Sequence, residues 1–158
     1  MTEQRFVIDG TNIVLLHGRA HPELRYVLAL CAYLKAEAVD FTCYFDANIS
    51  YILADSGGDQ LTVFEQLLAD PWWAEKLQVV PSGTDADEWV LTRAKADGAL
   101  VVSNDKYRDR ARKNRWIWKR RHAVVGCREQ LMLPTLGLEL PVLATAGEYL
   151  QSPAFLAP

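Results

Sequence analysis

Cysteine is scarce in this chain, and a long apolar run is missing. The three cysteines, Cys31, Cys43 and Cys127, are far apart and form no CxxC pair, so the sequence indicates neither a zinc site nor a disulfide framework. We interpret all three as small buried side chains in a reducing cytosol. No apolar run approaches the roughly 20 residues of a membrane helix, and no charged N-terminal segment precedes a long apolar core. We therefore expect a cytoplasmic protein with no signal peptide and no membrane partner.

Several enzyme classes lack their signatures here. No GxGxxG pattern follows the first predicted strand, which argues against a Rossmann cofactor site. A phosphohydrolase of the haloacid-dehalogenase type needs a second Asp two residues after its nucleophile, but Asp9 is followed by Gly10 and Thr11. A receiver domain needs paired acids after its first strand and a Lys after its fifth, and neither is clear. The three scattered histidines form no His/Lys pair of the kind that metal-free ribonucleases use.

The length and composition are those of one ordinary globular domain. Half of the 158 residues are hydrophobic. Short apolar β-branched runs predict strands over residues 5–8, 41–45, 77–80 and 99–102. Helical spacing predicts helices over 22–38, 84–97 and 103–114, and Gly98 would cap the helix over 84–97. The stretch 55–70 starts with flexible glycines and continues as a predicted amphipathic helix that Pro71 ends. Four strand–helix alternations predict an α/β fold, a Rossmann-like three-layer α/β/α sandwich around a mostly parallel sheet.

The rest of the chain gives weaker signals. Residues 122–126 and 130–133 are predicted strands that could pair as a hairpin, and 145–150 is a predicted short helix. We predict a single domain over residues 1–158, with a core of about 5–137 and a C-terminal tail over 138–158.

Polar side chains follow every predicted strand of the parallel sheet. In an open α/β sheet, the residues that follow the strands meet at one edge, where ligands bind. The candidates, in chain order, are Asp9 and Asn12; Asp46; Asp85, Asp87 and Glu88; and Asn104, Asp105 and Asp109. Such a gathering of carboxylates is costly without a cation, and Mg²⁺ or Mn²⁺ prefers oxygen ligands. The pattern indicates a metal that polarises a phosphodiester and activates a water.

Each acid also has a purely structural interpretation. Asp87 could pair with a Thr84 N-cap in a capping box. Asp9 and Asp46 could belong to turns, and Asp105 could cap its predicted helix, on which Asp109 would share its face. The convergence of four separate loops on one edge favours the functional interpretation.

Two segments resemble a known family. VIDGTN at residues 7–12 and TDADEWVLTRAKADGALVVSNDKYRD at 84–109 resemble the NYN branch of the PIN-like nucleases, and within it the Regnase-type (Zc3h12a-like) ribonuclease domain. GCREQLMLPTLG at 126–137 is similar to the closing hairpin of that family. The resemblance spans roughly residues 5–137 and implies a PIN-like fold.

The resemblance also implies roles for individual residues. Asp9, Asp87 and Asp105 would hold Mg²⁺ or Mn²⁺, with Asn12 completing the catalytic core and Asp109 as a further acid. Family members often carry adjacent acids before the third helix, where this chain has Ala86 and Asp87. The roles of Asp46, Asp85 and Glu88 therefore stay open.

A basic segment, residues 108–121, stands out from a chain with a net charge of −3. It holds eight Lys or Arg residues and one Asp, a net of +7, which leaves −10 for the remainder. Cations neutralise phosphates and indoles stack on unpaired bases. The predicted RNA-binding residues are Arg108, Arg112, Lys113, Arg115, Lys119, Arg120 and Arg121. The alternative places Trp116, Ile117 and Trp118 in the core, with Trp118 pointing inward from a strand and the cations pointing outward.

Together these observations predict a metal-dependent endoribonuclease that hydrolyses single-stranded RNA. A non-catalytic RNA-binding module with the same fold is the alternative. That alternative predicts a broken acid cluster, whereas Asp9, Asp87 and Asp105 are all present. The sequence leaves a homo-oligomer open.

Overall fold

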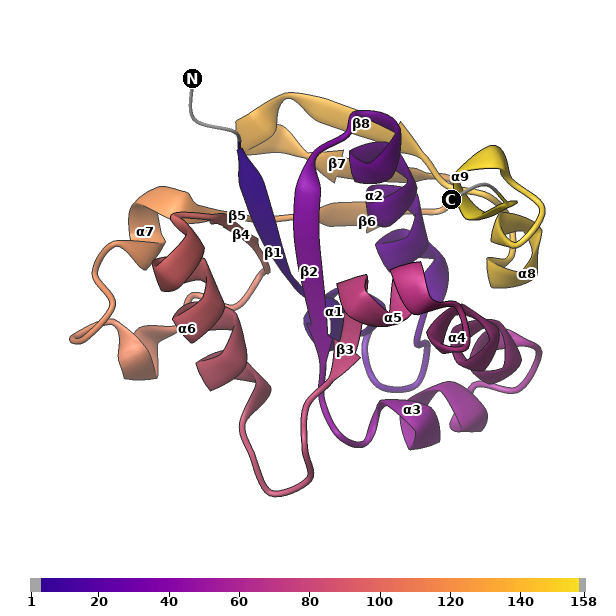
Figure 1. Cartoon of the computed structure of the whole chain (residues 1–158), viewed down its shortest axis with the longest axis horizontal. Coiled ribbons are helices and arrows are strands. Elements are labelled where there is room, and N and C mark those ends of the chain that lie inside the picture. Colours follow the sequence, from indigo (N-terminus) through magenta and orange to yellow (C-terminus); the bar gives the residue numbers. More distant parts are fainter. Residues whose placement is uncertain (1–3, 157–158) are drawn as a thin grey trace.

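The computed structural model describes residues 4–156, with a five-stranded parallel sheet at the centre (Figure 1). The strand order is β3-β2-β1-β4-β5, and every neighbouring pair is parallel. The strands are β1 (Arg5–Asp9), β2 (Asp40–Phe45), β3 (Leu77–Val79), β4 (Leu100–Val102) and β5 (Arg121–His122). The prediction of a mostly parallel sheet is confirmed.

Side chains along the strands alternate between two cores, one on each face of the sheet. Phe6 and Ile8 of β1 join the larger core, whereas Val7 between them joins the smaller one. This period of two is the normal geometry of a strand that is buried on both faces. In β2, Phe45 faces the larger core and Tyr44 the smaller. The predicted three-layer sandwich is therefore confirmed.

Helices cover both faces of the sheet (Figure 1). The larger core receives α1 (Gly10–Val14), α2 (Leu24–Ala36), α3 (Ile49–Asp55), α4 (Gln60–Leu68) and α5 (Pro71–Lys76). The smaller core receives α6 (Ala86–Asp97) and α7 (Ile117–Arg120). Helix α6 ends at Gly98, which adopts the left-handed conformation with φ of 63°, as predicted for its cap.

A second, antiparallel sheet closes the larger core. It has the order β6-β7-β8, with β6 (Val125–Cys127), β7 (Gln130–Leu133) and β8 (Leu138–Pro141), and a 3₁₀ turn, η2 (Pro134–Leu136), precedes β8. The predicted hairpin is right for β6 and β7, but His122 belongs to β5 of the parallel sheet. Residues assigned to the tail supply β8, α8 (Ala146–Tyr149) and α9 (Pro153–Leu156), and Leu140 and Tyr149 among them are buried.

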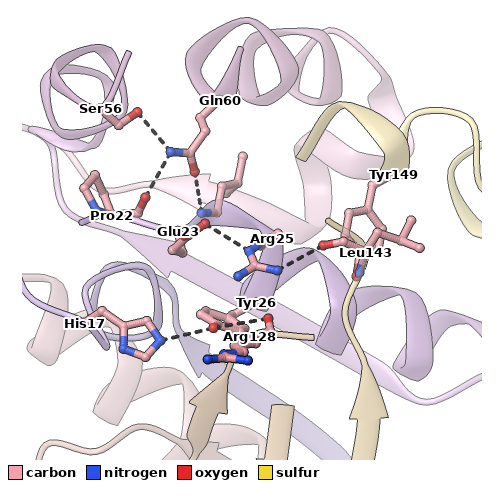
Figure 2. Close-up of polar contacts among 11 residues, drawn as sticks. His17, Pro22, Glu23, Arg25, Tyr26, Ser56, Gln60, Arg128, Leu143 and Tyr149 are labelled. Atoms are coloured by element: carbon pink, nitrogen blue, oxygen red, sulfur yellow. Dashed lines mark hydrogen bonds and ion pairs between the residues drawn. The ribbon is translucent and has the colours of Figure 1, made fainter. Parts of the chain in front are cut away.

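Polar contacts around the start of α2 attach the surrounding segments to it (Figure 2). The Gln60 side chain of α4 accepts the backbone N–H of Leu24 at 2.7 Å. The buried hydroxyl of Tyr26 lies 3.1 Å from a ring nitrogen of His17 and donates to the carbonyl of Arg128 at 3.5 Å. These contacts satisfy groups that α2 and the second sheet would otherwise bury without partners.

The helix predicted over residues 103–114 is wrong. The segment forms turns and one short 3₁₀ element, η1 (Arg108–Arg110), and Tyr107 has a left-handed φ of 50°. The side chain of Asp105 accepts the backbone N–H of Tyr107 at 2.7 Å, a local contact that competes with a helix. Asp105 and Asp109 therefore share no helix face.

The amphipathic helix predicted within residues 55–70 is present as α4. It begins at Gln60, after Gly57 and Gly58, whose positive φ values separate it from α3. Pro71 does not merely end a helix but opens α5, where the Asp70 side chain accepts the N–H of Trp72 at 2.9 Å.

Two of the three cysteines are buried, as expected, but Cys127 at the end of β6 is exposed. Over residues 4–156, no helix is both long enough and apolar enough to cross a membrane.

Candidate active site at the carboxyl edge of the sheet

The end of β1 fixes the first acid in place. Asp9 is the last residue of the strand, and Gly10 opens α1 directly against β2. A Cβ atom at Gly10 would lie 2.6 Å from a ring carbon of Phe45 and 2.7 Å from the sulfur of Cys43, closer than real Cβ atoms come. The Asp-Gly pair therefore allows the chain to turn at the sheet edge while Asp9 stays at the strand end.

Asp9 is the most buried acid of this edge, at 5% exposed. Its Oδ2 accepts hydrogen bonds from the hydroxyls of Ser103 and Tyr107, each at 2.8 Å. Burial raises the pKa of Asp9 to about 6; these two hydrogen bonds oppose the shift, and the charges of Asp46 and Asp105 add to it. Acids from three different loops thus act on one another here, as predicted.

Asp87 lies in the first turn of α6 and faces the same edge. The N-cap is Asp85, whose side chain accepts the Asp87 N–H at 3.0 Å, so the alternative of a Thr84 capping box is wrong. Burial, together with the charges of Asp9, Asp105 and Asp85, raises the pKa of Asp87 to about 7, and the charge of Arg110 opposes the shift. The charges of both other predicted metal ligands, Asp9 and Asp105, therefore act on this acid.

The two asparagines near the acids hold the loop after β4. The side-chain oxygen of Asn12 accepts the backbone N–H of Asn104 at 2.9 Å. The Asn104 side chain in turn donates to the carbonyl of Val124 at 3.0 Å and accepts its N–H at 2.8 Å. Asn12 is thus brought to the site, where it supports the loop that carries Asp105.

A cavity of about 450 Å³ opens between α6 and this loop. Acids and cations line it together, an arrangement that offers oxygen ligands to a cation and charged donors to a phosphate. The lining residues are Asp87, Asn104, Asp105, Lys106, Tyr107, Arg108, Asp109 and Arg110.

Three further acids border the cluster. Arg110 forms ion pairs with Asp85 and, at 3.2 Å, with Glu88, so these two acids are partly neutralised. The charge of Asp46 adds to the raised pKa of Asp9, and burial followed by the charge of Asp85 raises the pKa of Asp46 itself. Ser103, Tyr107 and Arg110 were not among the predicted site residues, although Ser103 and Tyr107 lie within the SNDKYRD stretch and Arg110 follows it directly.

Several cations of the basic segment are exposed and could contact a polyanion. Arg112, Lys113, Arg115 and Lys119 are exposed and form no ion pair with any of residues 4–156. Arg108 lines the cavity itself. These five cations remain available for phosphate contacts.

The other part of the basic segment packs against the domain. Ile117 is fully buried and Trp118 is 60% exposed, so the interpretation with Trp118 pointing inward from a strand is wrong; the residues form α7 instead. Arg120 lies over the ring of Trp116 at 5.1 Å. Arg121 donates to the carbonyl of Ser103 at 3.0 Å, so it supports the loop of the acid site.

Comparison with known proteins gives this arrangement a family. The Zc3h12a-like Ribonuclease NYN domain family matches residues 2–128. The chain belongs to this family. The resemblance inferred from the two sequence segments is therefore confirmed. No curated protein matches the chain.

Two solved structures of the plant protein-only RNase P enzyme PRORP2, from Arabidopsis thaliana, share the fold of this NYN domain. The first has a TM-score of 0.66 at 16% identity and covers 90% of this chain but 31% of that chain. The second has a TM-score of 0.64 at 17% identity and covers 84% of this chain and 30% of that chain. This chain thus spans about a third of the length of the PRORP2 chain. The structure of the PIN domain endonuclease Utp24 has a TM-score of 0.38 at 17% identity, and the match covers 88% of this chain and 95% of the Utp24 chain.

The donor set of the NYN domain fits a hydrated divalent cation. Within residues 4–156, no three His, Cys, Asp or Glu side chains lie close enough to hold an ion by themselves. Asp9, Asp87 and Asp105 nevertheless repel one another through their charges. Mg²⁺ usually keeps several waters and uses one or two carboxylates together with substrate phosphate oxygens. A closed cage of three carboxylates is therefore not needed.

Proposed function

We propose that this NYN domain is an endoribonuclease that hydrolyses phosphodiester bonds of single-stranded RNA with Mg²⁺ or Mn²⁺. The observation that carries the proposal is the convergence of Asp9, Asp87 and Asp105 from three separate elements. The charge of Asp105 contributes to the raised pKa of both Asp9 and Asp87. Such mutual repulsion lowers the stability of the metal-free protein, and a bound divalent cation would relieve it.

The residues divide between holding the cation and holding the substrate. Asp9, Asp87 and Asp105 would be the metal ligands, and the bound ion would polarise the phosphodiester and lower the pKa of a water. Lys106 and Arg108 line the same cavity and would contact the phosphate that is cut. Asp109 would add a further acid, and Asn12 would keep the loop of Asp105 in place.

The RNA strand would continue from the cavity along the basic segment. Arg112, Lys113, Arg115 and Lys119 would neutralise its phosphates, because their side chains are exposed. The Trp118 side chain, 60% exposed beside Lys119, would stack on an unpaired base. An exposed indole next to cations suits a single strand, whose bases are open to stacking. Arg120 and Arg121 would contribute charge while bound to the domain.

A non-catalytic RNA-binding module is the second candidate. One observation favours it: within residues 4–156 the carboxylates form no ready-made ion site. The exposed cations serve either candidate equally well. The two candidates differ in whether RNA is cut when a divalent cation is supplied.

The test uses the wild-type chain and one labelled single-stranded RNA in linear and circular form. Each is incubated with Mg²⁺, with Mn²⁺, or with EDTA, at equal ionic strength. We expect both forms to be cut with either metal and neither to be cut in EDTA, since an endonuclease needs no free end. Activity that survives EDTA would refute the metal mechanism, and binding without cleavage in every condition would support the non-catalytic module.

A further inference from the structure

A closed ring of four hydrogen bonds joins two of the proposed metal ligands, Asp9 and Asp105. The Ser103 hydroxyl donates to Asp9 Oδ2 at 2.8 Å and accepts the backbone N–H of Asp105 at 3.0 Å. Asp105 Oδ1 accepts the backbone N–H of Tyr107 at 2.7 Å. The Tyr107 hydroxyl donates to Asp9 Oδ2 at 2.8 Å and closes the ring. The ring thus couples the end of β1 to the loop after β4.

The ring occupies one oxygen of each carboxylate and leaves the other open. It takes up Oδ2 of Asp9 and Oδ1 of Asp105. No donor from residues 4–156 bonds Asp9 Oδ1 or Asp105 Oδ2, and neither atom belongs to the fully buried polar atoms that lack a partner. Solvent therefore reaches the free oxygens, and a cation at this edge would meet one oxygen from each acid.

The backbone of Tyr107 adopts an energetically unfavourable conformation. Its side chain is 2% exposed, and its φ of 50° lies in the left-handed region, which a bulky residue rarely adopts. Such a conformation persists only where the surroundings enforce it, and it is common at functional sites. The left-handed turn lets the N–H of Tyr107 reach Asp105 while its hydroxyl reaches Asp9.

We infer that Tyr107 is a positioning residue that fixes Asp9 and Asp105 as ligands with one oxygen each for the divalent cation. The inference rests on the proposed function, because it needs these acids to bind a metal. Its basis is that Tyr107 makes one hydrogen bond to each acid, through its hydroxyl and through its backbone N–H. One-oxygen ligation suits Mg²⁺ and Mn²⁺, which take oxygen ligands, and leaves room for waters and for a phosphate oxygen. Groups that orient metal ligands typically change metal affinity by about 10–100-fold when they are removed.

The test compares Tyr107→Phe with a matched control, Tyr26→Phe. Tyr26 is also fully buried, and its hydroxyl is also hydrogen-bonded, but its partners are His17 and Arg128 beside α2 (Figure 2). Both variants lose one buried hydroxyl, so a merely structural role predicts similar urea midpoints and similar Mn²⁺ affinities. Mn²⁺ binding to the metal-free chain is followed by electron paramagnetic resonance, and RNA binding is followed in EDTA.

We expect Tyr107→Phe to weaken Mn²⁺ binding by about 10–100-fold, with RNA binding in EDTA unchanged. Tyr26→Phe should bind Mn²⁺ as the wild type does. Equal Mn²⁺ affinity in Tyr107→Phe and the wild type would overturn the positioning role alone, as would equal weakening in both variants. Absence of Mn²⁺ binding in the wild type would overturn the proposed function and this inference together.

A second variant keeps the inference testable if Tyr107→Phe does not fold. Ser103→Ala removes the other donor to Asp9 Oδ2 and breaks the ring at a different point. It should weaken Mn²⁺ binding by the same factor, because Asp9 again loses one of the two hydrogen bonds that hold its Oδ2. Wild-type affinity in a folded Ser103→Ala variant would show that the ring does not govern the metal ligands.

Discussion

The replacement Asp9→Asn should stabilise the metal-free protein by an amount that grows with pH. Burial raises the pKa of Asp9 from the usual 3.8 to about 6, so the native state holds this proton more tightly than the unfolded chain does. Wild-type stability therefore falls as the pH rises from about 4 through 6, and the loss is complete above that range. Asn has the same shape and does not titrate, so the variant avoids this loss.

The size of the effect follows from the shift in pKa. A shift from 3.8 to about 6 corresponds to about 3 kcal/mol at most, at 1.36 kcal/mol for each pKa unit. At pH 4 the native Asp9 is still protonated and the unfolded one is only partly ionised, so the same linkage gives only about 0.5 kcal/mol. Little of this is lost to solvent screening, because Asp9 is 5% exposed. The hydrogen bonds from Ser103 and Tyr107 can still be accepted by the oxygen of an asparagine.

Urea unfolding of wild type and Asp9→Asn in EDTA, at pH 4, 5, 6, 7 and 8, measures the difference in unfolding free energy. We expect the advantage of the variant to rise from about 0.5 to at most about 3 kcal/mol over this range. Added Mg²⁺ at pH 8 should narrow the difference, because the ion would bind and stabilise the native wild type. The assignment of a raised pKa to Asp9 would be refuted if the difference in unfolding free energy did not depend on pH. It would also be refuted if the wild type became more stable relative to the variant as the pH rises.

Two further predictions concern the packing under the site and the path of the RNA. Gly10→Ala should lower the unfolding free energy by about 1–3 kcal/mol and slow cleavage, because its Cβ would meet the Phe45 ring at 2.6 Å; unchanged urea midpoints would contradict this. Reversing the charge of Arg112, Lys113 and Arg115 to Glu should weaken RNA binding and reduce the slope of log affinity against log salt by about 0.7 for each lost contact. The same reversal at Arg19, which pairs with Asp55 outside the basic segment, is the control, and an unchanged slope in the triple variant would exclude this path.

The position of the acid cluster follows from sequence because it depends on a general rule. Once four short strands are predicted to be parallel, the residues after each strand must meet at one edge. Asp9, Asp87 and Asp105 meet there, close enough for their charges to interact. No knowledge of side-chain contacts was needed for this step.

The shape of the loop after β4 did not follow from sequence. Residues 103–114 contain enough good helix formers to predict a helix, yet the loop is determined by distant partners. Asn104 bonds to Val124, and Tyr107 bonds to Asp9, which lies 98 residues earlier in the chain. Local propensity contains no information on such contacts, so the sequence could not assign Tyr107 a role.

The short helices and the orientation of Trp118 were also not predicted, because they depend on packing and not on the local sequence pattern. Helices α1, α3 and α5 have 5, 7 and 6 residues, too few for a helical period to be seen. Helices this short are stabilised by packing rather than by propensity. Trp118 was assigned inward from the alternation expected of a strand, but in the four-residue helix α7 the buried side chain is Ile117.

The central claim, that these carboxylates hold a cation that cuts RNA, is tested most directly by Asp105→Asn. Single-turnover cleavage and RNA binding are measured beside the wild type and a matched control, Asp70→Asn. Asp70 accepts the N–H of Trp72 at 2.9 Å, as Asp105 accepts that of Tyr107, but it precedes α5 and lines no part of the cavity. We predict that Asp105→Asn loses about 100-fold or more in cleavage rate while RNA affinity is kept or rises, and that Asp70→Asn cleaves as the wild type does. Wild-type cleavage by a folded Asp105→Asn variant would contradict the account.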